Sequence, residues 1–398
     1  MAKSKTKKER SFSRFVNNPF DFTLLITILL LLGIGLVMVL SASSPSALSK
    51  YGDSYSFFSK QLIFAILGVI AMLFISKIDY RFYQKFYKHA WWISLILLAM
   101  VLLIGTETNG AKRWITITRT LTVQPSEIVK MLMIIFYAGI LVKNRDDLES
   151  YGKGFIKHIC LVLPIIGLLI LEPHLSASVV IIGICSIMMI MAGCKFTHFA
   201  GTGAVAGVPI LAALIIFEPY RLQRVITFLD PWKDATGDGW QVIQSLYAIG
   251  SGGLFGVGLG DSKQKYLYIP EPHNDFIFSI IGEELGFIGC AIVLILFAIF
   301  IWRGILIAMR APDMFGSLLA VGITALVGIQ VIINIAVVTS SMPATGMPLP
   351  FFSYRWYSAV YIALWNGSII KHFKGSSKTI EITNNKTEDS KTKRKRRN

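Results

Sequence analysis

Long apolar stretches alternate with short polar breaks over most of the chain, from Phe22 to Ile370. A helix needs about 20 apolar residues to cross the hydrocarbon core of a bilayer. The fold class expected is therefore an all-α polytopic membrane protein. The pattern predicts about ten membrane-spanning helices, near residues 22–41, 61–76, 91–105, 127–142, 155–171, 175–193, 199–217, 275–302, 315–339 and 353–370.

The connection between the seventh and eighth predicted spans, residues 218–274, is much longer than the others. Loops of this length are usually functional or disordered. Its large aromatic residues, among them Trp232 and Trp240, favour a segment that lies on the surface or partly re-enters the membrane. Its glycine-rich stretch "GSGGLFGVGLG" lacks the flanking strand and helix that a phosphate-binding fingerprint requires.

Composition agrees with a membrane protein, since 54% of the residues are hydrophobic and 16% are charged. The net charge of +16 comes mostly from the ends, because residues 1–20 carry +5 and residues 371–398 carry +7. Basic segments favour the cytoplasmic side, so an even number of spans places both ends there. This charge therefore indicates topology and contact with anionic bilayer lipids, not a nucleic-acid partner. The four cysteines show no CxxC spacing, which argues against a zinc site or a disulfide framework.

The expected organisation is a single transmembrane domain with a basic tail at each end. Residues 1–20 form a cytoplasmic tail, residues 21–372 the transmembrane domain, and residues 373–398 a second cytoplasmic tail that we expect to be disordered. Residues 218–274 then form a large extracellular loop.

Three cations lie in a short loop on the predicted outer side, against the positive-inside tendency. They are Lys112, Arg113 and Arg119, within "NGAKRWITITRTLTVQPSEIVK". Lys130 follows inside the next predicted span, where an ionisable residue is a functional candidate. Either these cations pair with nearby acids or lipid headgroups, or they form a site for phosphate oxygens. Glu127, three residues before Lys130, shares its helix face and can partly neutralise it.

Carboxylates cluster in "PEPHNDFIFSIIGEELGFIG". Asp275 lies near the predicted water boundary, where it either accepts protons or caps the helix that follows. Glu283 and Glu284 lie roughly 12 Å deeper, at about 1.5 Å per helical residue. Buried carboxylates must be paired, hydrogen-bonded or protonated, so we expect these two to have structural partners.

Two more polar, proline-containing segments are predicted at the same face. They are "LEPHLSAS", with Glu172 and His174, and "SSMPATGMPLPFFSY", which follows Asn334. Irregular backbone near membrane depth is tolerated where it lines a cavity. Four such segments together predict a cavity that opens to the outside.

These motifs resemble those of the SEDS family (shape, elongation, division, sporulation), which includes FtsW, RodA and SpoVE. "NGAKRWI", "QPSEIVK", "LEPHLSAS", "PEPHNDFIFSIIGEELG" and "NIAVVTSSMPATGMPLPFFSY" occur in the family's order over residues 20–372. The last motif is more similar to the division and sporulation branch than to the elongation branch. The resemblance implies a peptidoglycan glycosyltransferase of the bacterial plasma membrane, which polymerises lipid II with a class B penicillin-binding transpeptidase as partner.

The resemblance also implies roles for single residues. The catalytic Asp of the family's H-x-D-F-I-F motif is Asp275 here, either as the general base for a sugar 4-hydroxyl or as a ligand of a divalent cation. The sugar transfer would invert the anomeric carbon, with undecaprenyl pyrophosphate as leaving group. Mg²⁺ or Mn²⁺ is the cofactor that this chemistry suggests, and no organic cofactor is expected. The candidate substrate-binding residues are Lys112, Arg113, Arg119, Glu127, Lys130, His174, His273 and Ser353.

The sequence departs from the family pattern at two places. His174 stands where the family usually has Asp, and Arg355, Trp356 and Tyr357 replace a run of small residues. If the family's Asp pairs with the lysine at position 130, that lysine has lost a partner here. These departures keep open an alternative function, a catalytically weakened scaffold for the transpeptidase. A flippase for lipid II is a separate alternative.

Overall fold

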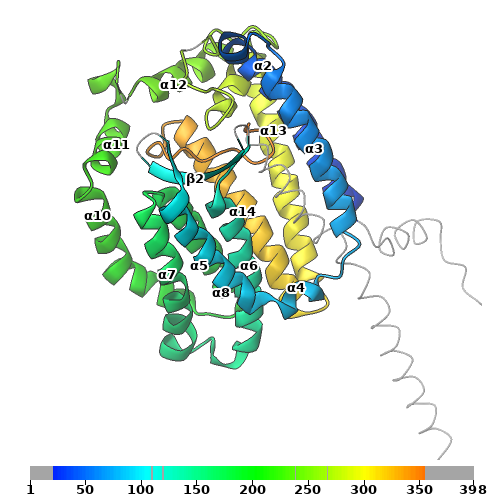
Figure 1. Cartoon of the computed structure of the whole chain (residues 1–398), viewed down its shortest axis with the longest axis vertical. Coiled ribbons are helices and arrows are strands. Elements are labelled where there is room, and N and C mark those ends of the chain that lie inside the picture. Colours follow the sequence, from blue (N-terminus) through cyan, green and yellow to red (C-terminus); the bar gives the residue numbers. More distant parts are fainter. Residues whose placement is uncertain (1–20, 109–110, 119–120, 238, 267, 355–398) are drawn as a thin grey trace, which may run out of the picture.

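The computed structural model describes residues 21–354 except 109–110, 119–120, 238 and 267. Within that part of the chain, nine helices are long and apolar enough to span a membrane, and they form a bundle (Figure 1). They confirm nine of the ten predicted spans; the tenth, near 353–370, lies almost wholly outside the described residues. The spans are α2 (Phe22–Tyr51), α3 (Ser56–Ile75), α5 (Tyr87–Ile104), α6 (Pro125–Lys143), Tyr151–Leu171 with α7 (Lys157–Leu171), α8 (Leu175–Ala192), Phe196–Ile216 with α9 (Phe196–Thr202) and α10 (Val208–Ile216), α13 (Ile277–Met309) and α14 (Met314–Val338).

Helices α6 and α14 form the centre of the bundle, since 72% of the most apolar window of each is buried. Helix α14 packs against α6, α8 and α13, so it can be apolar on every face. Small residues permit this close packing: a Cβ at Gly322 would lie 2.5 Å from Cγ2 of Ile134 on α6. Helix α10, in contrast, lies at the edge of the bundle, and nothing in the window Phe196–Ile216 is buried (Figure 1).

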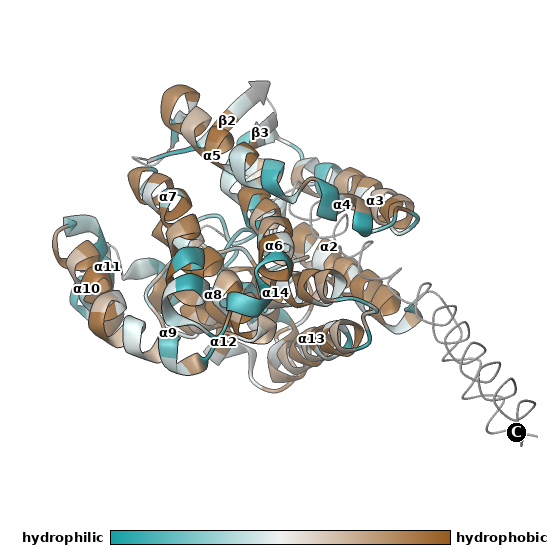
Figure 2. Cartoon of the chain, turned by 90° about the horizontal axis from the view of Figure 1, so that it is seen from below, coloured by the Kyte–Doolittle hydropathy of each residue, from teal (hydrophilic) through white to brown (hydrophobic). Residues whose placement is uncertain are grey.

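The outward faces of the peripheral helices are apolar (Figure 2). Such a surface would be unfavourable in water and suits contact with lipid tails. Together with the nine spans, it makes this a multi-pass membrane protein. On α3 alone, the exposed large side chains are Ile63, Ile66, Leu67, Ile70, Leu73 and Phe74.

A small antiparallel sheet joins α5 to α6, in a place where the sequence analysis named no strand. Its strands, in the spatial order β1-β2-β3, are β1 (Thr106–Thr108), β2 (Ala111–Thr118) and β3 (Leu121–Val123). The stretch "WITIT" of β2 is rich in the β-branched and aromatic residues that suit strands. In the register of β1 and β2, Glu107 faces Lys112, which places opposite charges on paired strands.

The long connection between α10 and α13 is folded. It contains α11 (Pro219–Leu229), the short 3₁₀ helix η4 (Pro231–Asp234) and α12 (Trp240–Gly252). Helix α12 packs along α13 and buries Val242, Ile243 and Ala248. The connection therefore covers one end of the bundle, at the top of Figure 1.

The glycine-rich stretch after α12 docks into a break in α13. Gly286 has φ 64° and ψ −164°. These angles are not helical, so the helical hydrogen bonds are interrupted there. The loop replaces them: the N–H of Phe287 donates to the Gly253 carbonyl at 2.9 Å, and the N–H of Val257 donates to the Glu283 carbonyl at 3.0 Å. Only glycine fits at position 256, because a Cβ there would lie 2.1 Å from the Glu284 carbonyl oxygen.

The side chains of Glu283 and Glu284 hold the same loop. Glu283 accepts hydrogen bonds from the Ser262 hydroxyl and, at 2.9 Å, from the Lys263 N–H. Glu284 accepts a hydrogen bond from Ser41 at 2.6 Å and pairs with Lys265 at 3.0 Å. The expectation of structural partners for these two carboxylates is confirmed.

Candidate active site

Asp275 lies in the turn that precedes α13. The helix begins at Ile277 with Phe276 as its N-cap residue, and no side-chain cap is present in this described segment. Asp275 is therefore not the N-cap residue of α13 but the residue before it. Its main chain is fixed, because its carbonyl oxygen accepts a hydrogen bond from Asn334 Nδ2 at 2.7 Å. The side chain is only half-buried, so the carboxylate has access to solvent.

The backbone of Gly346 faces this carboxylate. A Cβ at Gly346 would lie 3.6 Å from Asp275 Oδ2, and the residue has φ +68°, a conformation that favours glycine. Asn334 connects the two sides, since its Nδ2 also donates to the Met347 carbonyl at 2.8 Å. The side-chain amide thus fixes the distance between the turn before α13 and the opposite segment.

Residues 344–347, which we call the 344–347 segment, are held from two further helices. Ser176 of α8 donates from Oγ to the Thr345 carbonyl at 2.8 Å. Arg224 of α11 donates from Nη1 to the Ala344 carbonyl at 2.6 Å. Irregular backbone needs such side-chain donors because it has no helical partners for its carbonyl groups.

Two other candidates, His273 and Ser353, have packing and hydrogen-bonding roles in the same region. The His273 ring lies 4.7 Å from the Phe57 ring and 5.6 Å from the Tyr354 ring. Burial lowers the pKa of His273 to about 4, so the imidazole is neutral near pH 7. The Ser353 hydroxyl accepts a hydrogen bond from the Leu349 N–H at 2.7 Å and closes a local turn.

Arg113 joins the sheet to the α7–α8 junction. Its guanidinium donates to the carbonyl oxygens of Glu172, at 3.4 Å, and Pro173. Lys112, its neighbour on β2, is exposed. Arg119 lies outside the described residues.

Lys130 is buried on α6, where its Nζ lies 2.7 Å from Glu127 Oε1, so the expected ion pair is confirmed. His174 contacts the start of the same helix, with Nε2 at 2.7 Å from the side-chain nitrogen of Gln124. Lys130 therefore keeps an acidic partner although position 174 is not acidic.

Glu172 is the candidate that the sequence analysis left without a role. Its side chain is buried, and neither carboxyl oxygen has a hydrogen-bond partner within the described structure. Burial raises the pKa of this carboxyl to about 8, against the opposing effect of Arg113. A buried, neutral carboxyl group thus lies beside the Arg113 contact.

These contacts link the four polar segments of the sequence analysis. Arg113 connects the sheet to the α7–α8 junction, Ser176 connects α8 to the 344–347 segment, and Asn334 connects that segment to Asp275. The segments therefore meet at one end of the bundle.

Residues 22–373 match the sequence profile of the cell cycle protein family FtsW/RodA/SpoVE. The chain belongs to this family. Stage V sporulation protein E of Bacillus subtilis is 45% identical over 88% of this chain and 96% of its own length. A probable peptidoglycan glycosyltransferase FtsW of Trichlorobacter lovleyi is 40% identical over 92% of this chain and 95% of its own.

Solved structures agree with this membership of the FtsW/RodA/SpoVE family. One chain of a peptidoglycan synthase complex, described for its coordination of polymerization and crosslinking, superposes with a TM-score of 0.74. That chain is 28% identical in sequence, and the match covers 89% of this chain and 98% of that one. Rod shape determining protein RodA of Thermus thermophilus superposes with a TM-score of 0.67 at 25% identity, over 89% and 97% of the two chains.

If a divalent cation takes part in the reaction, Asp275 is the candidate ligand named from the sequence. No group of three His, Cys, Asp or Glu side chains that could hold a metal occurs in residues 21–354 as far as they are described. Mg²⁺ commonly binds through one or two carboxylates together with substrate phosphates. A divalent cation that acts here would need oxygen atoms of a bound pyrophosphate in addition to Asp275.

Proposed function

We propose that this chain is a peptidoglycan polymerase of the bacterial plasma membrane, which transfers the lipid II-linked glycan to the 4-hydroxyl of an acceptor sugar. One observation supports this most strongly: the half-buried Asp275 carboxylate faces the bare backbone of Gly346. A hydroxyl group can approach a carboxylate there without meeting a side chain from that position. The names of the relatives, which include peptidoglycan glycosyltransferases, agree with the proposal.

In the proposed reaction Asp275 acts as the general base. The acceptor 4-hydroxyl gives its proton to Asp275 while the oxygen forms a bond to the anomeric carbon of the donor. The bond from that carbon to undecaprenyl pyrophosphate breaks, and the configuration inverts from α to β. A positioned base of this kind contributes about 10² to 10⁴ in rate.

Cations on the sheet and α6 would balance the leaving pyrophosphate. Lys112 is exposed, and the guanidinium of the half-buried Arg113 is held by carbonyl oxygens that leave its charge in place, whereas the charge of Lys130 is offset by Glu127. We therefore assign the larger electrostatic effect to Lys112 and Arg113. A divalent cation would supply further positive charge at the pyrophosphate oxygens.

We further propose that a class B penicillin-binding transpeptidase is the partner. The support is the similarity to a chain of a complex that performs polymerization and crosslinking. The scaffold alternative rested on the two departures from the family pattern, at His174 and at residues 355–357. Lys130 keeps an acidic partner despite the first departure, and the second lies outside the described residues. We therefore propose an active enzyme within such a complex, and the test below separates it from the scaffold.

The test is polymerisation of lipid II by the purified protein with its transpeptidase and a divalent cation, resolved as a glycan ladder on a gel. Asp275→Asn keeps the size of the side chain but removes the base, so we expect a loss of about 10² to 10⁴ in rate. Glu271→Gln is the matched control, because Glu271 lies in the same turn but is exposed and pairs with Lys50. A full-length ladder from Asp275→Asn would exclude Asp275 as the base, and no ladder from the unaltered protein would favour the scaffold.

A further inference from the structure

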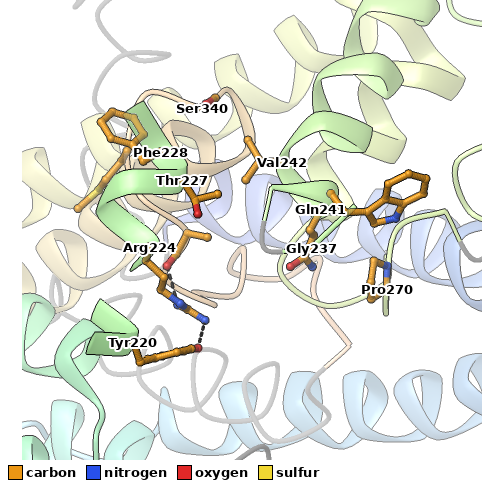
Figure 3. Close-up of a pocket in the computed structure, with 12 residues that line it drawn as sticks. Tyr220, Arg224, Thr227, Phe228, Gly237, Gln241, Val242, Pro270 and Ser340 are labelled. Carbon is orange, nitrogen blue, oxygen red and sulfur yellow. Dashed lines mark hydrogen bonds between the residues drawn. The ribbon is translucent and has the colours of Figure 1, made fainter. Parts of the chain in front are cut away.

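A pocket of about 210 Å³ lies between α11 and α12, in the long connection before α13. Side chains of α11, among them Tyr220, Arg224 and Thr227, face Gln241 and Val242 of α12 across it (Figure 3). None of the functions derived above uses this pocket. Ligand sites for drug-sized molecules have about 300–1,000 Å³, so this one suits a single ring or a short side chain.

The positive charge in the pocket already has partners. Arg224 donates to the Ala344 carbonyl and to the Tyr220 hydroxyl, and its guanidinium lies 4.6 Å from the centre of the Tyr220 ring. No other charged side chain is present among the residues that line the pocket. A neutral ligand therefore suits the pocket better than an anion.

The rest of the wall contains both polar and apolar groups. The Thr227 hydroxyl is buried and has no hydrogen-bond partner within the described residues. Buried polar atoms are rarely left unpaired, so this hydroxyl indicates a missing water or ligand atom. Gln241 adds an amide, while Phe228, Val242 and Met342 add apolar surface. Hydroxyl groups on the rim of an apolar ring, as in a pyranose sugar, match this lining.

The pocket is also connected to the candidate active site. Ala344, which lines it and binds Arg224, lies two residues before Gly346, whose backbone faces the Asp275 carboxylate. A sugar in the pocket would touch the same chain segment that borders the reacting groups. Its neighbours along a glycan strand would extend toward or away from Asp275.

We propose that this pocket is a subsite for one N-acetylated sugar of the glycan strand, at a distance from the sugar that reacts. The inference rests on the proposed polymerase function. In it, Thr227 and Gln241 donate or accept hydrogen bonds with the sugar, while Phe228 and Val242 cover an apolar face of the ring. Arg224 holds the 344–347 segment in the shape that the strand meets.

The test is binding of the uncharged trisaccharide of N-acetylglucosamine to the full chain in detergent. Binding is measured by saturation-transfer NMR. Thr227→Val keeps the side-chain shape and breaks no hydrogen bond of the described structure, so the protein should fold. We expect Thr227→Val and Gln241→Leu each to weaken binding about fivefold, because each removes one hydrogen bond. Gln223→Ala is the matched control, since Gln223 is exposed on α11 and does not line the pocket.

Binding that is absent in the unaltered protein, or equal in all variants, overturns the proposal. So does a Thr227→Val variant that binds the trisaccharide normally but loses its complex with the transpeptidase, because the surface would then serve a protein. Polymerisation is measured in parallel, and the pocket variants should raise the KM for a glycan acceptor with little change in kcat. The two proposals can fail separately. If the unaltered protein makes no polymer, the proposed function fails; if the Asp275→Asn variant still binds the trisaccharide in that case, the sugar site stands.

Discussion

Gly346→Ala should reduce the rate of polymerisation by more than its backbone strain alone would explain. A non-glycine residue at φ +68° costs about 1–2 kcal/mol of backbone strain. The new methyl group would lie 3.6 Å from Asp275 Oδ2, which is an ordinary contact, so no clash adds to that cost. An acceptor hydroxyl, however, must come within about 2.6–3.2 Å of the base, and the methyl group would occupy one side of its approach. We expect a rate loss of about 10²-fold, the effect of a displacement of roughly 1 Å in the reacting groups.

Gly52→Ala separates backbone strain from the effect on the site. Gly52 ends α2 with φ +71°, close to the value of Gly346, and a Cβ there would meet no atom within 4 Å. Both variants should therefore lose a similar amount of thermal stability in the same detergent. Polymerisation of lipid II, measured as initial rate from the glycan ladder, should fall only in Gly346→Ala.

Two results would refute this reasoning. A Gly346→Ala variant with an unchanged rate would show that the acceptor does not approach along the Gly346 side of the carboxylate. An equal loss of rate in Gly346→Ala and Gly52→Ala would show that strain anywhere in this fold impairs catalysis.

Two further predictions concern buried charges. Lys265→Met should destabilise the protein by about 3–5 kcal/mol, because it leaves Glu284 charged and buried, and the double change with Glu284→Leu should recover much of that loss in thermal unfolding. Glu172 has its folded pKa, about 8, above the ordinary value of 4.5. Its contribution to stability is complete below pH 4.5 and is lost as the pH rises through 8, so Glu172→Gln should flatten the fall in thermal stability over that range. Equal pH profiles for Glu172→Gln and the unaltered protein would contradict the second prediction.

Hydropathy predicted the membrane-spanning helices well and their ends less well. The first span was expected to end near residue 41, yet α2 continues to Tyr51. Its serine-rich continuation looks like a loop in sequence, but Ser41, Ser43 and Ser46 are buried against the protein. Ser41 donates a hydrogen bond to Glu284. The two residues are more than 200 positions apart, so a single sequence gives no sign that they are partners.

The sequence predicted which residues belong to the candidate site better than it predicted the contacts between them. The Glu127–Lys130 pair follows from local spacing, whereas Asp275 was singled out as catalytic by the resemblance to the family's motif. Asn334, Ser176 and Arg224 were not expected to act together, because each of them holds the backbone of a distant segment. Side chains that bind irregular backbone leave no periodic signal in the sequence.

The acids at this end of the bundle differ by their partners, and this difference narrows the choice of base. Glu283 accepts a hydrogen bond from the docked loop, and Glu284 accepts one from Ser41 and pairs with Lys265. Both carboxylates therefore have structural roles. Glu127 pairs with Lys130, and the Glu172 side chain is buried, which separates its carboxyl group from solvent. Asp275 combines a fixed main chain with a half-buried carboxylate, which are the properties that the proposed general base requires.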